Sequence, residues 1–373
     1  MLLNIMSNDL VYPNINIVFD DSIYAVDDDK EFICNIGQRF NSHITFPSYA
    51  ESIKIGGSPS NYNQPLNIPN SVTNMSSCFV SCSNYNQPVE LSHNVTNTVQ
   101  MLYACANFDQ PINLPNSITN VYGTFLYANN FNSQINIEDG ITSLYGLLSC
   151  ARNYNREVTI PNSVTNVSFM FNGAINYNTP VNIPNSVTNC AYMLNGCTNF
   201  NQSVDIPDSV LDCSSMFSSC ANYNKPITIP NGVTSCASMF SSAANYNSDV
   251  VFPNSVTNLS GAFMFASNMM GNVYIHANSL MNAWNMFGAC NNIHDIYIDG
   301  IQNNGQCNRM LRNNGYSRVN IFTDDTGKEY LYNTYILNNG TKPGWTNDDG
   351  NGCFYSTTMN IYVYNTWDGT VPA

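Results

Sequence analysis

The sequence is poor in charged residues, and basic residues are the scarcest among them. Asp, Glu, Lys and Arg make up 10% of the 373 residues, and 11 bases against 25 acids give a net charge of −14. Between residues 55 and 308 the only Lys or Arg residues are Arg152, Arg156 and Lys225. Nucleic acids and anionic membranes are bound by clustered Lys and Arg. We therefore expect neither of them as a partner.

Long hydrophobic runs and export signals are also missing. No run of 18 apolar residues exists, so we expect no membrane insertion. The first 18 residues lack a basic start, and Asn, Asp and Pro interrupt their apolar residues. This pattern does not predict a signal peptide.

Catalytic and metal-binding motifs are absent from the sequence as well. The four histidines are scattered, and none lies in a zinc-protease, nucleophile-elbow or paired-cysteine motif. We expect a protein that is not an enzyme and that binds no cofactor or metal.

What the sequence does contain is a repeat of 23 residues. The aromatic residue of each Asn-aromatic-Asn/Asp triplet recurs at this interval: Tyr62, Tyr85, Phe108, Phe131, Tyr154, Tyr177, Phe200, Tyr223 and Tyr246. A period between 20 and 50 residues is typical of a solenoid, in which each unit buries its apolar face against its neighbours. The repeat therefore predicts stacked coils.

One coil, residues 222–244, shows the expected local structure. Ile227 and Ile229 alternate with polar or Pro residues, which predicts a short half-buried strand that ends at Pro230. Met239 and Phe240 are spaced as in one helical or 3₁₀ turn on the opposite side. The predicted fold is a leucine-rich-repeat-like, right-handed solenoid of about twelve coils with one parallel β-sheet, short helical or 3₁₀ turns opposite, and a cap at each end.

The 13 cysteines fall mostly in columns of the repeat. Cys190, Cys213 and Cys236 form one column, which Val167 and Leu259 continue. Columns that mix Cys with Ala, Val or Leu predict small buried side chains with free thiols. Stacked coils also bring Cα atoms within bridging distance, so disulfides are the alternative.

The repeated Asn and Gln residues allow two interpretations. They could present amides to a glycan, or they could satisfy backbone groups at the turns and stack on their equivalents in the next coil. A scaffold must be periodic whereas a ligand rarely is, so we favour the structural role. Binding is then expected where the columns change.

The repeats resemble a known family. The phrase Ile-Pro-Asn-Ser-Val-Thr-Asn at 68–74 and 183–189, and Met-Phe-x-x-Cys at 216–220, resemble BspA-like leucine-rich repeats. Asn-Tyr-Asn-Gln-Pro at 61–65 is similar to the Asn-rich FNIP variant. The resemblance covers about residues 40–322 and implies adhesion and recognition at cell surfaces, or a bacteriophage-encoded protein. Tyr, Ile, Val, Met and Phe replace the usual leucines.

The two ends depart from the repeat. We expect an N-terminal β cap or anchor at 1–39, the solenoid at 40–322, and an aromatic-rich C-terminal cap or docking segment at 323–373. The termini are candidate contacts with other virion proteins. The oligomeric state does not follow from the sequence.

Two places in the array depart from the columns and are candidate ligand-binding sites. In the outward strand column, which is mostly Asn, Thr or acidic, Tyr274 and Tyr297 fall in neighbouring coils, with His294 and Asp295 on the adjoining turn. Aromatic rings beside carboxylates are typical of sugar or protein sites. The alternative is a repeat that degenerates toward the cap. Arg156 and Glu157 form a second candidate, or a surface ion pair.

We therefore expect a non-enzymatic adhesion or receptor-recognition protein that binds a cell-surface glycan or protein, in a virion (as a phage tail component) or at an extracellular surface. Two alternatives are a structural or assembly scaffold and a cytoplasmic protein-interaction solenoid.

Overall fold

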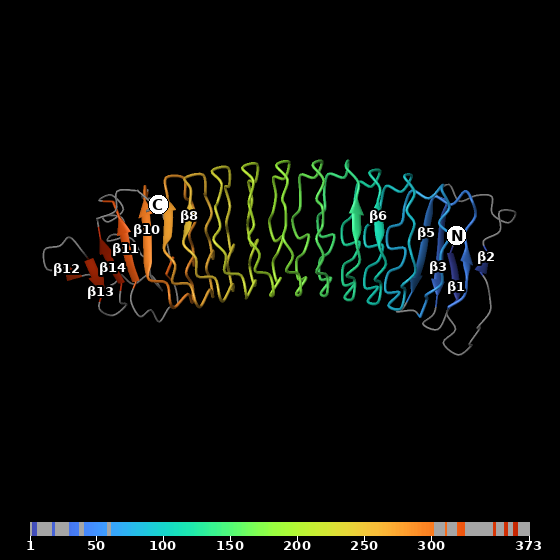
Figure 1. Cartoon of the computed structure of the whole chain (residues 1–373), viewed down its shortest axis with the longest axis horizontal. Helices are drawn as coiled ribbons and strands as arrows, with labels where there is room; N and C mark the ends of the chain where they lie inside the picture. The colour runs from blue at the N-terminus through green and yellow to red at the C-terminus, as the bar shows by residue number, and fades with distance from the viewer. Residues whose placement is uncertain are drawn as a thin grey trace. The chain divides into compact units, whose positions relative to one another are not determined.

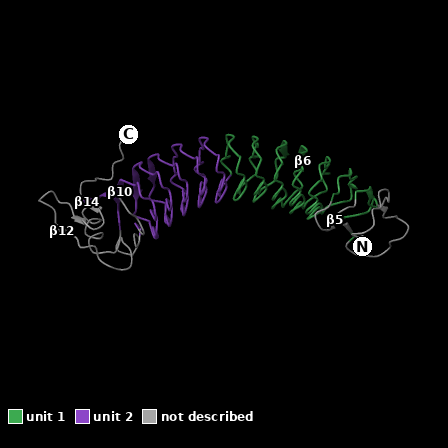
Figure 2. Cartoon of the chain, turned by 90° about the horizontal axis from the view of Figure 1, so that it is seen from below, with its two compact units in different colours: residues 1–186 green, residues 187–373 purple. Residues whose placement is uncertain are grey.

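The computed structural model describes residues 2–5, 17–18, 30–36, 41–57, 61–301, 310–311, 319–324, 346–347, 354–356 and 361–364. Two compact units, Met1–Ser186 and Val187–Ala373, are coloured green and purple in Figure 2. Within each unit successive coils stack side by side and the paired strands of neighbouring coils run parallel (Figure 1). The predicted repeat solenoid is confirmed.

The described residues of unit 1 form seven short strands. The order β1-β3-β5 forms one parallel sheet, and β2 pairs with β4 and β6 with β7, also in parallel. Their bounds are β1 Leu2–Ile5, β2 Ile17–Val18, β3 Glu31–Ile36, β4 Ile44–Thr45, β5 Ser52–Gly57, β6 Ile112–Leu114 and β7 Ile135–Ile137.

In the part of unit 2 that the structure describes, seven strands form one sheet in the order β12-β13-β14-β11-β10-β9-β8. The neighbouring strands in the order β14-β11-β10-β9-β8 pair in parallel, whereas β13 pairs antiparallel with both β14 and β12. The bounds are β8 Val250–Phe252, β9 Val273–His276, β10 Asp295–Asp299, β11 Val319–Thr323, β12 Thr346–Asn347, β13 Phe354–Ser356 and β14 Ile361–Tyr364. The terminal segments thus contribute strands, and their role as caps stays a prediction.

The strand side is less continuous than a sheet through every coil would be. Within residues 61–301, each coil that has proline at neither end of its strand segment forms a strand. These strands are β7, β9 and β10. In β7 the N–H of Glu138 donates to the Leu114 carbonyl at 3.1 Å, and most other coils carry proline at this position. Proline cannot donate and holds φ near −65°, which disfavours the strand. The prediction of a strand at residues 227–229, between Pro226 and Pro230, is wrong, although β6 does form between Pro111 and Pro115 beside the proline-free β7.

The opposite side is a run of β-turns; the described residues contain no helix, so the predicted helical or 3₁₀ turn is wrong. Met216 and Cys220 donate to carbonyls three residues earlier, while Phe217 between them donates to Met239 of the next coil at 2.9 Å. This alternation requires left-handed residues, and Ser215 and Ser219 have φ of 55° and 58°. A helix cannot continue through such residues. In exchange, alternate N–H groups on this side join neighbouring coils.

The repeated aromatic residues form the core, as predicted. All nine are buried, with at most 1% of the surface exposed. Rings of neighbouring coils are stacked; the centroids of Tyr62 and Tyr85 are 5.9 Å apart, and those of Tyr223 and Tyr246 are 5.8 Å apart. Phe217 lies 4.2 Å from Tyr223 and fills the space between the column and the turns. Burial of these rings is the main hydrophobic contribution of each coil.

The tyrosine hydroxyls of the core aromatic column lead to a prediction about stability. The hydroxyl of Tyr223 is buried and has no hydrogen-bond partner among the described residues, and a buried unsatisfied polar group destabilises the fold. We expect Tyr223→Phe to raise the free energy of unfolding by about 1 kcal/mol in urea titrations. The reverse control, Phe200→Tyr at the preceding coil, should lower it. A loss of stability in Tyr223→Phe would contradict the assignment.

The residues of positive φ in the turns lead to a second stability prediction. Gly261 has φ of 63°, in the column that holds Ser238 in the preceding coil. We expect Gly261→Ala to lower the free energy of unfolding by about 1 kcal/mol, because a Cβ is unfavourable at positive φ. Ser238→Ala is the matched control, since that residue already bears a Cβ at φ 54°. Equal effects of the two variants would refute the proposed cause.

Candidate functional site

The Asn columns serve the scaffold, as we favoured. Asn84 donates its amide to the Asn61 side chain at 2.8 Å, and Asn107 continues the ladder by donating to Asn84 at 3.2 Å. In a second column the Asn63 side chain accepts the backbone N–H of Asn86 at 2.8 Å. These amides satisfy one another and the turns, so they are not available as a ligand array.

The cysteine columns are also structural. The ten cysteines whose side chains are described are thiols, and all except Cys150 are buried. Burial raises the pKa of Cys190 to about 12, with a contribution from Asp212, and burial raises that of Cys290 to about 12. A buried thiol with a raised pKa is unreactive. Cys34, Cys307 and Cys353 lie outside the described side chains.

This burial predicts the pattern of thiol labelling. In native protein at pH 8, iodoacetamide should modify Cys150 and leave Cys190, Cys213, Cys220 and Cys236 unmodified, because alkylation requires an accessible thiolate. Peptide mass spectrometry before and after urea denaturation would measure this. Full labelling of the four buried cysteines without denaturant would show that the column opens in solution.

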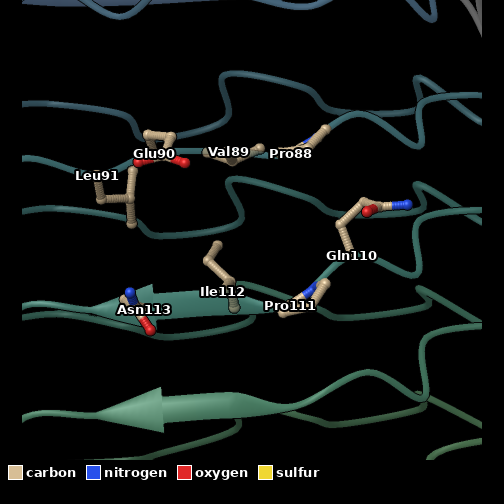
Figure 3. Close-up of a pocket in the computed structure, with 8 residues that line it drawn as sticks. All are labelled: Pro88, Val89, Glu90, Leu91, Gln110, Pro111, Ile112 and Asn113. Atoms are coloured by element: carbon tan, nitrogen blue, oxygen red, sulfur yellow. The ribbon is translucent and has the colours of Figure 1, made fainter.

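A hollow of about 350 Å³ lies on the strand side of unit 1, between residues 88–91 and residues 110–113 (Figure 3). The first segment contains Pro88 and the second contains Pro111. The residues that follow these prolines, Val89 and Ile112, are buried. The hollow is a gap where no strand ladder joins the two coils. Its single charged residue is Glu90, and we assign no ligand to it.

The outer face of β8–β11 in unit 2 differs from the rest of the array. Along these strands Val250, Phe252, Ile296 and Ile298 are buried in the core, and the residues between them lie on the outer face. The middle of this face is an aromatic row formed by Tyr274, Tyr297 and Phe322, which are in register on β9, β10 and β11.

The rings of the aromatic row are stacked. The centroids of Tyr274 and Tyr297 are 4.7 Å apart with planes 19° apart, and those of Tyr297 and Phe322 are 4.7 Å apart at 14°. The predicted pairing of Tyr274 with Tyr297 is confirmed. Tyr274 is only 4% exposed, whereas Tyr297 and Phe322 are half-buried. Because the ring faces cover one another, mainly the ring edges of Tyr297 and Phe322 are accessible.

An acidic row flanks the aromatic row at the strand starts. It consists of Asp249, Asn272, Asp295 and Asn320. Asp249 accepts the backbone N–H of Asn272 at 2.7 Å, and Asp295 accepts the Asn320 amide at 2.7 Å. The His294 Nδ1 lies 2.8 Å from the same Asp295 oxygen. The structure therefore brings together four of the predicted site residues: Tyr274, Tyr297, His294 and Asp295.

A second polar row lies at the strand ends. His276 Nδ1 is 3.1 Å from Asp299 Oδ1, and Asp324 accepts the backbone N–H of Gly300 at 3.0 Å. The described residues of the three rows include four carboxylates and no Lys or Arg. Among the residues that the structure describes, no group of three His, Cys, Asp or Glu side chains could hold a metal ion.

The surrounding charge affects the tyrosines. Burial raises the pKa of both Tyr274 and Tyr297, and the carboxylates of Asp249 and Asp295 raise it further. Both phenols therefore stay protonated at neutral pH and can donate a hydrogen bond. The face combines ring edges, hydroxyl donors and carboxylate acceptors, which are groups that recognition surfaces use.

The other predicted site is not part of this face. Arg156 and Glu157 are exposed on unit 1, and the Arg156 Nε donates to the Asn132 carbonyl instead of pairing with Glu157. Sequence reasoning missed Phe322, because the step from Tyr297 to Phe322 is 25 residues and breaks the 23-residue register. The alternation of residues in 319–323, which places Phe322 between Ile321 and Thr323, was the pattern that could have indicated its outward position.

The described residues contain no helix long and apolar enough to span a bilayer.

Comparison with known families gives a match over residues 60–160, 142–251 and 206–303 to the family described as "Mycoplasma protein of unknown function, DUF285". The chain belongs to this family. The matched stretches span most of the solenoid, and the predicted resemblance to BspA-like repeats is confirmed for this DUF285 protein.

The fold of the DUF285 repeats is similar to that of a solved leucine-rich repeat protein. A leucine-rich repeat protein from Bacteroides ovatus is 17% identical with a TM-score of 0.57, covering 82% of this chain and 83% of that one. A leucine rich cell surface protein from Faecalibacterium prausnitzii is 18% identical with a TM-score of 0.35, covering 77% and 88%. A search of curated proteins finds no match.

Proposed function

We propose that the protein is a non-enzymatic recognition protein and that the outer face of β8–β11 binds a basic protein segment at a cell surface. The observation that supports the proposal is the change of the middle column from polar residues to the aromatic row Tyr274, Tyr297 and Phe322. Scaffold columns repeat, so a local change to stacked aromatic residues points to a partner.

The chemistry of the face favours a protein over a glycan. A sugar stacks on an open ring face, and the faces in this row are stacked on one another. Ring edges and phenol hydroxyls contact protein side chains readily, and the carboxylates of Asp295 and Asp299 complement Lys or Arg. The partner we propose therefore presents basic residues beside apolar ones.

The test measures binding of a fluorescent peptide rich in Lys, Arg and Trp to the full chain, with an acidic peptide of equal length as the reference. Neutralising the face with Asp295→Asn and Asp299→Asn should weaken binding about tenfold, since each partly exposed ion pair contributes up to about 1 kcal/mol. The matched control is Asp205→Asn with Asp208→Asn, which removes two exposed charges elsewhere on unit 2.

An equal loss in the two double variants would show a general charge effect and contradict a site on this face. Binding unaffected by both would favour the alternative role as an assembly scaffold that docks through its ends. The placement of the chain on a phage particle or another surface stays a prediction of the sequence.

A further inference from the structure

A separate aromatic surface lies on the turn side of unit 1. Tyr122, Tyr127 and Tyr145 are 40%, 43% and 39% exposed, although large aromatic side chains are usually covered. With half-buried Tyr103 and Phe169 they place an aromatic ring in each of four successive coils. We refer to these five residues as the tyrosine cluster.

The rings of the tyrosine cluster are arranged differently from those of the core and of the outer strand face. The centroids of Tyr122 and Tyr145 are 5.2 Å apart with planes 35° apart. Tyr145 meets Phe169 at 61°, and Tyr103 meets Tyr127 at 87°. The last two contacts are edge-on and the first is tilted, in contrast to the parallel stacks, and the exposed parts of Tyr122, Tyr127 and Tyr145 offer apolar ring surface to a ligand.

The local sequence supports this arrangement. Both Tyr122 and Tyr145 precede a glycine, and Gly146 has φ of 63°. A Cβ on Gly146 would lie 3.1 Å from an edge carbon of the Tyr122 ring. Glycine therefore satisfies the left-handed turn and also leaves room for the Tyr122 ring to lie against the next coil.

The surroundings of the cluster carry little charge. The turn segments 97–106, 120–129, 143–152 and 166–175 contain one charged residue, the exposed Arg152 at the end of its segment, in a chain of net charge −14. A hollow of about 230 Å³ beside the rings is lined by Thr119, Asn120, Val121, Tyr122, Ser143 and Tyr145. Hydroxyl and amide groups thus lie next to partly exposed rings, and none of the residues that line the hollow is charged.

We propose that the tyrosine cluster is a binding site for a neutral carbohydrate chain. A sugar ring has one apolar C–H face that packs on an aromatic ring, while its hydroxyls exchange hydrogen bonds with hydroxyl and amide groups. With Arg152 as the one charge of the four turn segments, the surface offers little of the electrostatic complementarity on which an anionic glycan or a basic protein segment would depend. At least one ring in each of four coils matches a linear oligosaccharide that lies across several coils.

The experiment is isothermal titration of the full chain with three neutral oligosaccharides, cellohexaose, chitohexaose and maltohexaose, and with hyaluronan as the anionic reference. We expect at least one neutral chain to bind. Tyr122→Ala combined with Tyr145→Ala should weaken this binding about tenfold, as the loss of two aromatic contacts implies. Tyr122→Phe, which keeps the ring, should bind within about threefold of the wild type.

Trp284→Ala is the matched control, because Trp284 is 45% exposed and occupies the equivalent repeat position in unit 2. Its affinity should equal that of the wild type. The proposal is overturned if none of the three neutral chains binds, if hyaluronan binds more tightly, or if the double Tyr variant binds as the wild type does. A change of molecular mass of that variant in sedimentation would assign the cluster to self-association and equally refute the proposal. None of these results bears on the acidic outer face of β8–β11.

Discussion

The hydrogen bonds between turn segments of neighbouring coils are the constraint on which each unit depends. Alternate N–H groups, such as those of Ser215, Phe217 and Ser219, donate to the next coil at 2.7–2.9 Å. The residues between them close β-turns within their own coil. Both sets of bonds require a left-handed residue twice per coil, and Gly, Ser, Ala and even Tyr or Phe accept this conformation. The energetic cost of those positions is offset by a ladder that every coil shares.

Because the hydrogen bonds between turns join neighbouring coils, the strand side does not have to form a continuous ladder. Where prolines bracket the strand segment, as at residues 226–230, the coil is held by turns, Asn ladders and core packing; β6 is an exception, which lies between Pro111 and Pro115 and pairs with the proline-free β7. Where both prolines are missing, as in β9 and β10, a regular parallel sheet forms and gives a flat outer face. The aromatic row lies on that face. The absence of proline thus favours a sheet surface at β9 and β10.

The 23-residue register was enough to predict the solenoid, the aromatic core column, the buried cysteines and the pairing of Tyr274 with Tyr297. These features depend on which residues recur, and recurrence is visible in the sequence. The helical turn was predicted wrongly because Met239 and Phe240 have helical spacing, while Ser238 and Ser242 adopt positive φ without a glycine to reveal it. The covering of Tyr274 and the role of Phe322 depend on side-chain packing and on a change of register. Neither can be read from a column of equivalent residues.

Hydrogen exchange resolved by residue is the measurement that tests the central role of the turn ladder most directly. The account predicts that the amides of Phe217 and Ser219, which donate to the next coil, exchange slowly, whereas those of Ile227 and Ile229 on the proline-bearing strand side exchange much faster. Slower exchange of Ile227 and Ile229 than of Phe217 and Ser219 would contradict it, because the strand side would then hold the coils together.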